Sequence, residues 1–188
     1  MLEIPNILLV SGSGRNCGKT TVACNIIRHL ARTEMVVGLK ISPHFHPSGN
    51  KQQIVAEEEG YRIFRETDKH SGKDSSRMLN AGASEVFFIQ CTDGNLHKVY
   101  EYLKKSILSD QAVVCESGSF ASVYQPGLHL LIKGINADDS KKSYLSNLKL
   151  ADVILTQKDL SETQLYSKIV FLDKKWTIKK RAGFKTGS

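Results

Sequence analysis

Apolar and polar residues near the start of the chain form a strand, helix and strand pattern. Residues 7–10 (Ile-Leu-Leu-Val) are a short apolar run that ends in small residues, which is typical of a buried strand. Apolar side chains then recur at helical spacing from 22 to 30, which predicts a helix that ends near Arg32. Residues 35–41 form a second strand candidate. This order is a βαβ unit, whose crossover implies a parallel sheet.

The rest of the chain repeats the alternation of strands and helices. Short apolar or alternating runs predict strands at 61–65, 86–89, 112–115, 129–132, 153–155 and 169–172. Helical spacing predicts helices over 73–80, ending at Gly82, over 96–107, and between the strands at 129–132 and 153–155. The acidic run 57–59 is expected on a solvated helix face, and 42–50 is expected to be a loop. The pattern predicts one doubly wound α/β domain.

Length and charge narrow this picture. A chain of 188 residues is long enough for one full core, and 40% hydrophobic with 24% charged residues is a globular balance. No apolar run approaches the ~20 residues of a membrane helix, so none is expected. The formal charge is +7, but six basic residues and no acid lie in 174–188, which leaves residues 1–173 at +1. We expect one domain over 1–173, a basic C-terminal segment over 174–188, and no nucleic-acid partner.

The cysteines and the N-terminus bear on the compartment. The four cysteines lie far apart and form no C-x-x-C pair, so we expect free, buried thiols and neither disulfides nor a structural zinc; they are Cys17, Cys24, Cys91 and Cys115. Residues 1–10 contain neither a basic leader nor a small-residue cleavage site. These observations favour the cytoplasm.

The segment between the first strand and helix has the composition of a phosphate-binding loop. The pattern G-x-x-x-x-G-K-[ST] ends here in Gly18, Lys19 and Thr20, whereas Ser13 stands at its first glycine, between two glycines. We expect Lys19 to reach the β- and γ-phosphates, the Thr20 hydroxyl to bind Mg²⁺, and loop N–H groups to surround the phosphates. The other loop residues expected to contact the nucleotide are Gly14, Arg15, Asn16, Cys17 and Thr21. A plain glycine-rich turn is the alternative.

Two further residues are expected at the carboxyl edge of the sheet, where ligands bind in such folds. Glu116 directly follows the strand 112–115, so it is a candidate for the Mg²⁺ shell or for orienting a water. Lys40 should lie at the end of the strand next to the phosphate-loop strand, where it could bridge the γ-phosphate and a second substrate. A surface acid and a solvated lysine are the respective alternatives.

Other candidates are more ambiguous. Asp159 ends Thr-Gln-Lys-Asp after a late strand, where it would either accept from a guanine ring or cap the next helix. His44 and His46 would face the same side of an extended loop and contact phosphate, pterin or metal, or simply belong to a polar loop. Asp74 and Arg77 share one helix face, where a surface ion pair is equally expected.

Residues 72–83 (Gly-Lys-Asp-Ser-Ser-Arg-Met-Leu-Asn-Ala-Gly-Ala) resemble the G-K-D-S-x-R-x-x-x-A-G-A segment of the molybdopterin-guanine dinucleotide biosynthesis protein B (MobB) family. Residues 38–46 resemble its G-x-x-K-H segment, and 115–118 its V-E-G strand end. The resemblance implies the three-layer fold of P-loop NTPases with a mainly parallel sheet. It also implies GTP as the nucleotide, a molybdopterin nucleotidyltransferase as partner, a homodimer, and roles for Asp74 and Arg77.

The longer phosphate loop is similar to that of dethiobiotin synthetase, which has a glycine six places before its Gly-Lys pair, as Gly12 is here. That family also ends its second strand in a lysine, to which Lys40 is similar. We expect Mg²⁺-dependent binding and hydrolysis of GTP or ATP in molybdenum cofactor maturation, with Lys19, Glu116 and Lys40 as catalytic residues. The alternatives are an ATP-dependent small-molecule ligase or kinase, and a nucleotide-binding adaptor without turnover.

Overall fold

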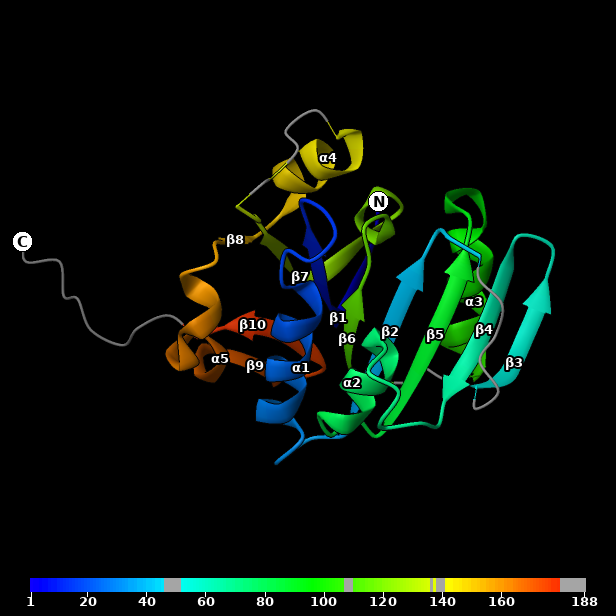
Figure 1. The fold of residues 1–188 in the computed structure, drawn as a ribbon, viewed down its shortest axis with the longest axis horizontal. Helices are drawn as coiled ribbons and strands as arrows, with labels where there is room; N and C mark the ends of the chain where they lie inside the picture. Colours follow the sequence, from blue (N-terminus) through cyan, green and yellow to red (C-terminus); the bar gives the residue numbers. More distant parts are fainter. Residues whose placement is uncertain (46–51, 107–109, 136, 138–140, 180–188) are drawn as a thin grey trace, which may run out of the picture.

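The computed structural model describes residues 1–45, 52–106, 110–135, 137 and 141–179. Within them, an eight-stranded sheet lies between layers of helices (Figure 1). Its strands are β1 (Leu2–Gly12), β2 (Val36–Ser42), β3 (Gln52–Glu58), β4 (Tyr61–Glu66), β5 (Glu85–Cys91), β6 (Ala112–Glu116), β7 (Tyr124–Ile132) and β8 (Val153–Leu155).

The strand order is β3-β4-β5-β2-β6-β1-β7-β8. From β5 to β8 all neighbours are parallel, and the β3–β4 hairpin adds two antiparallel strands at one edge. Parallel strands need crossover helices, and these cover both faces of the sheet. The predicted α/β class with a mainly parallel sheet is therefore confirmed.

Helices pack an apolar cluster onto each face of the sheet. The helices are α1 (Lys19–Leu30), α2 (Asp74–Asn80), α3 (Leu96–Ser106), α4 (Lys142–Leu150) and α5 (Thr163–Lys168), with 3₁₀ turns η1 (Asp93–Asn95), η2 (Phe120–Ser122) and η3 (Asp159–Ser161). Side chains of α1, α2 and α5 form one cluster with the sheet, and those of α3 and η2 form the other. The site described below lies on the α1 and α2 face.

Two expectations about the sheet are wrong. The acidic run 57–59 is not helical, because it ends β3 and enters the turn to β4, where Gly60 has φ 86°. Most β3 side chains are exposed or half-buried, so the strand leaves little apolar alternation in the sequence. The second mistaken expectation placed β2 beside β1, whereas β6 lies between them, as sheet order does not follow chain order.

The described part of the basic C-terminal segment contributes to the body of the protein. Strands β9 (Ile169–Leu172) and β10 (Lys175–Ile178) form an antiparallel ribbon, in which Trp176 is 1% exposed. Its indole Nε1 donates to the Asn6 carbonyl oxygen at 2.9 Å, and its ring centroid lies 5.4 Å from that of Phe171. Residues 180–188, which include the basic residues Lys180, Arg181 and Lys185, lie outside the described residues.

All four cysteines are free and buried, as the sequence predicts. Among the described residues, no helix combines the length and apolar character needed to cross a bilayer.

Trp176→Ala should lower the free energy of unfolding by about 3–5 kcal/mol, because it leaves a cavity where a buried aromatic ring was packed. Leu172→Ala, at a residue of β9 that is 55% exposed, is the matched control and should change stability by no more than about 0.5 kcal/mol. Urea denaturation measures both. A loss below about 1 kcal/mol for Trp176→Ala would show that the ribbon does not contribute to the core.

Candidate functional site

The loop between β1 and α1 turns sharply at Gly18, directly before the helix begins. Gly18 precedes α1 with φ 102°, a left-handed conformation that favours glycine, and its carbonyl oxygen accepts the first helical bond from Val22 N at 3.0 Å. A Cβ atom on Gly18 would lie 2.5 Å from Leu160 Cδ1. The conformation and the close neighbour together require glycine here, so the loop leads directly into the N-terminus of α1.

Ser13, which stands at the first-glycine position, helps to hold this loop. Its backbone N–H donates to the Ile132 carbonyl at 3.0 Å, and its hydroxyl accepts from Gly134 N at 3.0 Å. On the other side, Gln157 Nε2 donates to the Cys17 carbonyl at 3.0 Å. The loop is thus tied to the ends of β7 and β8. The anchoring roles of Ser13 and Gln157 leave no local signature in the sequence, because their partners lie more than a hundred residues away.

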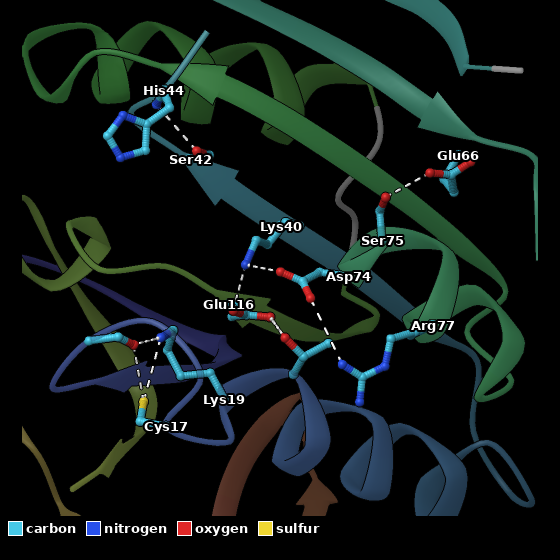
Figure 2. Close-up of polar contacts among 12 residues, drawn as sticks. Cys17, Lys19, Lys40, Ser42, His44, Glu66, Asp74, Ser75, Arg77 and Glu116 are labelled. Carbon is cyan, nitrogen blue, oxygen red and sulfur yellow. Dashed lines mark hydrogen bonds and ion pairs between the residues drawn. The ribbon is translucent and has the colours of Figure 1, made fainter. Parts of the chain in front are cut away.

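Lys19 lies over its own loop. Its Nζ donates to the Gly14 carbonyl and lies 3.5 Å from Cys17 Sγ (Figure 2). Arg15 and Asn16, between these residues, are exposed, and Asn16 is left-handed with φ 56°. The ammonium of Lys19 is therefore held beside the backbone N–H groups expected to contact phosphate.

Glu116 joins the start of α1 to the neighbouring strand β2. Its carboxylate, on a residue that is 1% exposed, accepts from Thr20 Oγ1 at 2.9 Å and from Lys40 Nζ at 2.5 Å. Glu116 pairs in register with Val10 of β1 and with Lys40 of β2, so all three side chains point to the α1 face. The structure therefore brings together the predicted magnesium residues, Thr20 and Glu116.

Asp74, the first residue of α2, completes the cluster. Its Oδ2 lies 2.7 Å from Lys40 Nζ, so the ammonium lies between two carboxylates (Figure 2). Arg77 Nη1 is 3.9 Å from Asp74 Oδ1, and Arg77 Nη2 donates to Thr21 Oγ1 at 3.4 Å. The predicted Asp74–Arg77 ion pair is present, but Asp74 also binds Lys40. We call Lys40, Asp74 and Glu116 the Lys40 cluster.

Charges shift the pKa values within this cluster. Burial alone would lower the pKa of Lys40, but the neighbouring carboxylates, Glu116 foremost, raise it above its ordinary value. Burial alone would raise the pKa of Asp74, but the hydrogen bond from Lys40 and its positive charge lower it, and the net result is a pKa below the ordinary value. Lys40 is thus held charged near neutral pH, and Asp74 is held ionised.

The donor set fits Mg²⁺ with a nucleotide. Mg²⁺ prefers oxygen ligands and commonly takes only one or two from the protein, with phosphate and water supplying the others. The Thr20 hydroxyl and the Glu116 carboxylate are such oxygens. The residues therefore suit a metal that arrives with phosphates.

The remaining predicted residues lie outside this cluster. Asp159 Oδ2 accepts from Thr156 N at 2.6 Å and from Thr156 Oγ1 at 2.7 Å, and the backbone bond in particular lowers the pKa of Asp159. The carboxylate thus bonds back to the preceding turn, and Asp159 is itself the first residue of η3, whose N-cap is Lys158, so it does not cap the helix expected near Leu160. His44 is exposed just beyond β2, and its N–H donates to Ser42 Oγ at 3.2 Å. His46 lies outside the described residues.

Comparisons with known proteins support the fold. No protein-family model and no curated protein matches the chain. Among solved structures, LpxK from Aquifex aeolicus in complex with ATP matches with a TM-score of 0.52 and 16% identity over 87% of this chain. The match covers 51% of LpxK, so this chain spans about half the length of that protein. At this identity the likeness concerns the fold alone, and it supports the mainly parallel α/β architecture described above.

Proposed function

We propose that this protein binds a nucleoside triphosphate with Mg²⁺ in the β1–α1 loop and promotes hydrolysis or transfer of its γ-phosphate. One observation carries the proposal: Thr20, the residue after the loop lysine, donates to the buried carboxylate of Glu116. A phosphate loop that leads into a helix and faces an acidic strand end is the arrangement that phosphoryl-transfer proteins use. The ATP complex of LpxK supports a nucleotide as the ligand.

The roles follow from the geometry. Backbone N–H groups of the loop and the N-terminus of α1 would bind the phosphates, and Lys19 would add a positive charge at the β- and γ-phosphates. Thr20 and Glu116 would hold Mg²⁺, which supplies neutralisation of the phosphate charge when bound. Lys40, fixed by two carboxylates, would face the γ-phosphate or a second substrate.

A more specific proposal concerns the identity of the nucleotide, the biosynthetic role and the partner protein. Because residues 72–83 resemble the MobB family, we propose GTP as the nucleotide, molybdenum cofactor maturation in the cytoplasm as the role, and a molybdopterin nucleotidyltransferase as the partner of a homodimer. Two contacts support it, since Asp74 and Arg77 of this segment reach Lys40 and Thr21. The most specific part of the resemblance therefore lies at the candidate site.

A second candidate is phosphoryl transfer from ATP to a small molecule, as in dethiobiotin synthetase. The position of Lys40 beside Asp74, which is about two-fifths exposed, favours it, because a substrate could reach this pair. Lys40 donates to Asp74 and Glu116 with two of its three N–H groups, so one donor remains for a substrate carboxylate. Phosphate release that depends on a small carboxylic acid would favour this candidate, and tight binding without turnover would favour an adaptor.

Lys19→Ala should weaken binding of Mg²⁺–nucleotide by about 10- to 100-fold, because hydrogen bonds to charged groups contribute about 1.5–3 kcal/mol. Isothermal titration calorimetry measures the change. Lys98→Ala, at an exposed lysine of α3 on the opposite face, is the matched control and should bind as the wild type does. Unaltered affinity in Lys19→Ala would exclude the β1–α1 loop as the phosphate site.

Asp159→Asn should weaken GTP binding and leave ATP binding unchanged if Asp159 reads the guanine ring, since guanine presents a ring N1–H beside its 2-amino group, whereas adenine N1 carries no hydrogen. Competition of both nucleotides against a fluorescent analogue measures the two affinities in the variant and the wild type. An equal effect on both nucleotides would show that Asp159 acts through its turn with Thr156 and not through the base.

A further inference from the structure

Glu66, the last residue of β4, is a buried carboxylate outside the Lys40 cluster. It is 4% exposed, and acidic side chains are rarely buried this far without partners. Its Oε2 accepts from Ser75 Oγ at 2.6 Å and from Gln52 Nε2 at 3.1 Å. Its Oε1 accepts from the backbone N–H groups of Thr67 and Asp68, both at 3.1 Å. These four donors, all neutral, come from β3, from α2 and from the chain after β4.

This arrangement suits a carboxylate in particular. An ionised carboxyl group has only acceptors, so it can accept from all four donors at once. A glutamine would bring an N–H₂ group that itself donates, and a backbone N–H cannot accept. The two backbone bonds also set the direction in which the chain leaves β4 toward α2.

Ser75 connects Glu66 to the candidate site. It follows Asp74 in the first turn of α2, and Asp74 Oδ2 is 2.7 Å from Lys40 Nζ (Figure 2). α2 has only seven residues, and its N-cap Lys73 makes no side-chain cap bond. The first turn therefore lacks the side-chain anchor that a helix usually receives from its N-cap. The Ser75–Glu66 bond supplies an anchor at this place.

We propose that Glu66 is a positioning residue for the candidate site: through Ser75 it fixes the first turn of α2 so that the Asp74 carboxylate meets Lys40. The inference rests on the proposed function, since Lys40 and Asp74 are taken to act on the γ-phosphate or its acceptor. The hydrogen bonds of Glu66 and Ser75 described above involve no residue of the phosphate loop, although Asp74 also accepts a hydrogen bond from Thr20 at the start of α1. Glu66 should therefore affect turnover and not nucleotide binding.

Ser75→Ala tests this step with a small change, because alanine is favourable in a helix. We expect kcat to fall by about 10- to 100-fold, as catalytic groups misplaced by about 1 Å lose activity on this scale. The KM for the nucleotide should stay within about twofold of the wild type. A fall in kcat at constant KM indicates that the change affects the transition state and not the binding of the nucleotide. Glu57→Gln, at an exposed acid of the same hairpin, is the control and should leave both constants unchanged.

A double-mutant cycle separates positioning from general destabilisation. Because Glu66 and Ser75 act through Asp74, Ser75→Ala combined with Asp74→Asn should be no slower than Asp74→Asn alone. If Ser75→Ala only destabilised the fold, its fold-decrease in kcat would multiply with the fold-decrease caused by Asp74→Asn. An unchanged kcat in Ser75→Ala, or multiplied losses in the double variant, would overturn the inference.

A crystal structure of Ser75→Ala tests the same claim without activity. We expect the Asp74 carboxylate to leave Lys40, with the Oδ2–Nζ distance growing beyond 4 Å from 2.7 Å. An unchanged distance would overturn the inference even if the wild type turned over no nucleotide. Failure of the proposed function would instead appear as absent nucleotide binding or turnover in the wild type, so the two failures are distinguishable.

Discussion

The burial of one carboxylate, that of Glu116, constrains the arrangement of the whole candidate site. An acidic side chain that is 1% exposed must be paired and hydrogen-bonded, because removing one partner of a buried pair costs about 3–5 kcal/mol. Thr20 and Lys40 supply the partners, and they come from α1 and β2. The two hydrogen bonds to the Glu116 carboxylate therefore fix the start of α1, the end of β6 and the Lys40 side chain of β2 relative to one another.

The parallel sheet makes this pairing possible. In-register neighbours on β1, β6 and β2 place Val10, Glu116 and Lys40 in one row across the sheet, with their side chains on one face. α2 then brings Asp74 to the other side of the Lys40 ammonium. The result is one cation between two anions beside a loop suited to phosphate. Arg77, whose Nη1 lies 3.9 Å from Asp74 Oδ1, adds a second cation, so that two positive and two negative side chains balance one another.

Local patterns predicted the parts of this structure that local chemistry determines. The apolar run 7–10, the Gly18-Lys19-Thr20 turn and the acid after the strand 112–115 each have a signature within about ten residues. The α/β class and the position of Glu116 at the carboxyl edge follow from them. The sequence also makes Thr20 and Glu116 separate candidates for the Mg²⁺ shell, and the hydrogen bond between them is a finding of the structure.

Other features depend on contacts that no local pattern contains. The insertion of β6 between β1 and β2 and the anchoring of the loop by Ser13 and Gln157 join residues far apart in the chain. β3 was missed because its exposed, charged side chains resemble those of a solvated helix. Trp176 and Ile178 within the basic segment indicate that it docks either on the body as an edge strand or on an acidic partner, and the structure packs Trp176 against the core.

The most direct test of the central claim is the Mg²⁺ dependence of nucleotide binding, compared between the wild type and Glu116→Gln. If Thr20 and Glu116 hold the metal that arrives with the phosphates, Mg²⁺ should tighten nucleotide binding in the wild type. Most of this enhancement should be lost in Glu116→Gln, although the metal-free affinity stays similar. Binding that does not respond to Mg²⁺ in the wild type, or an enhancement that persists in Glu116→Gln, would contradict the account.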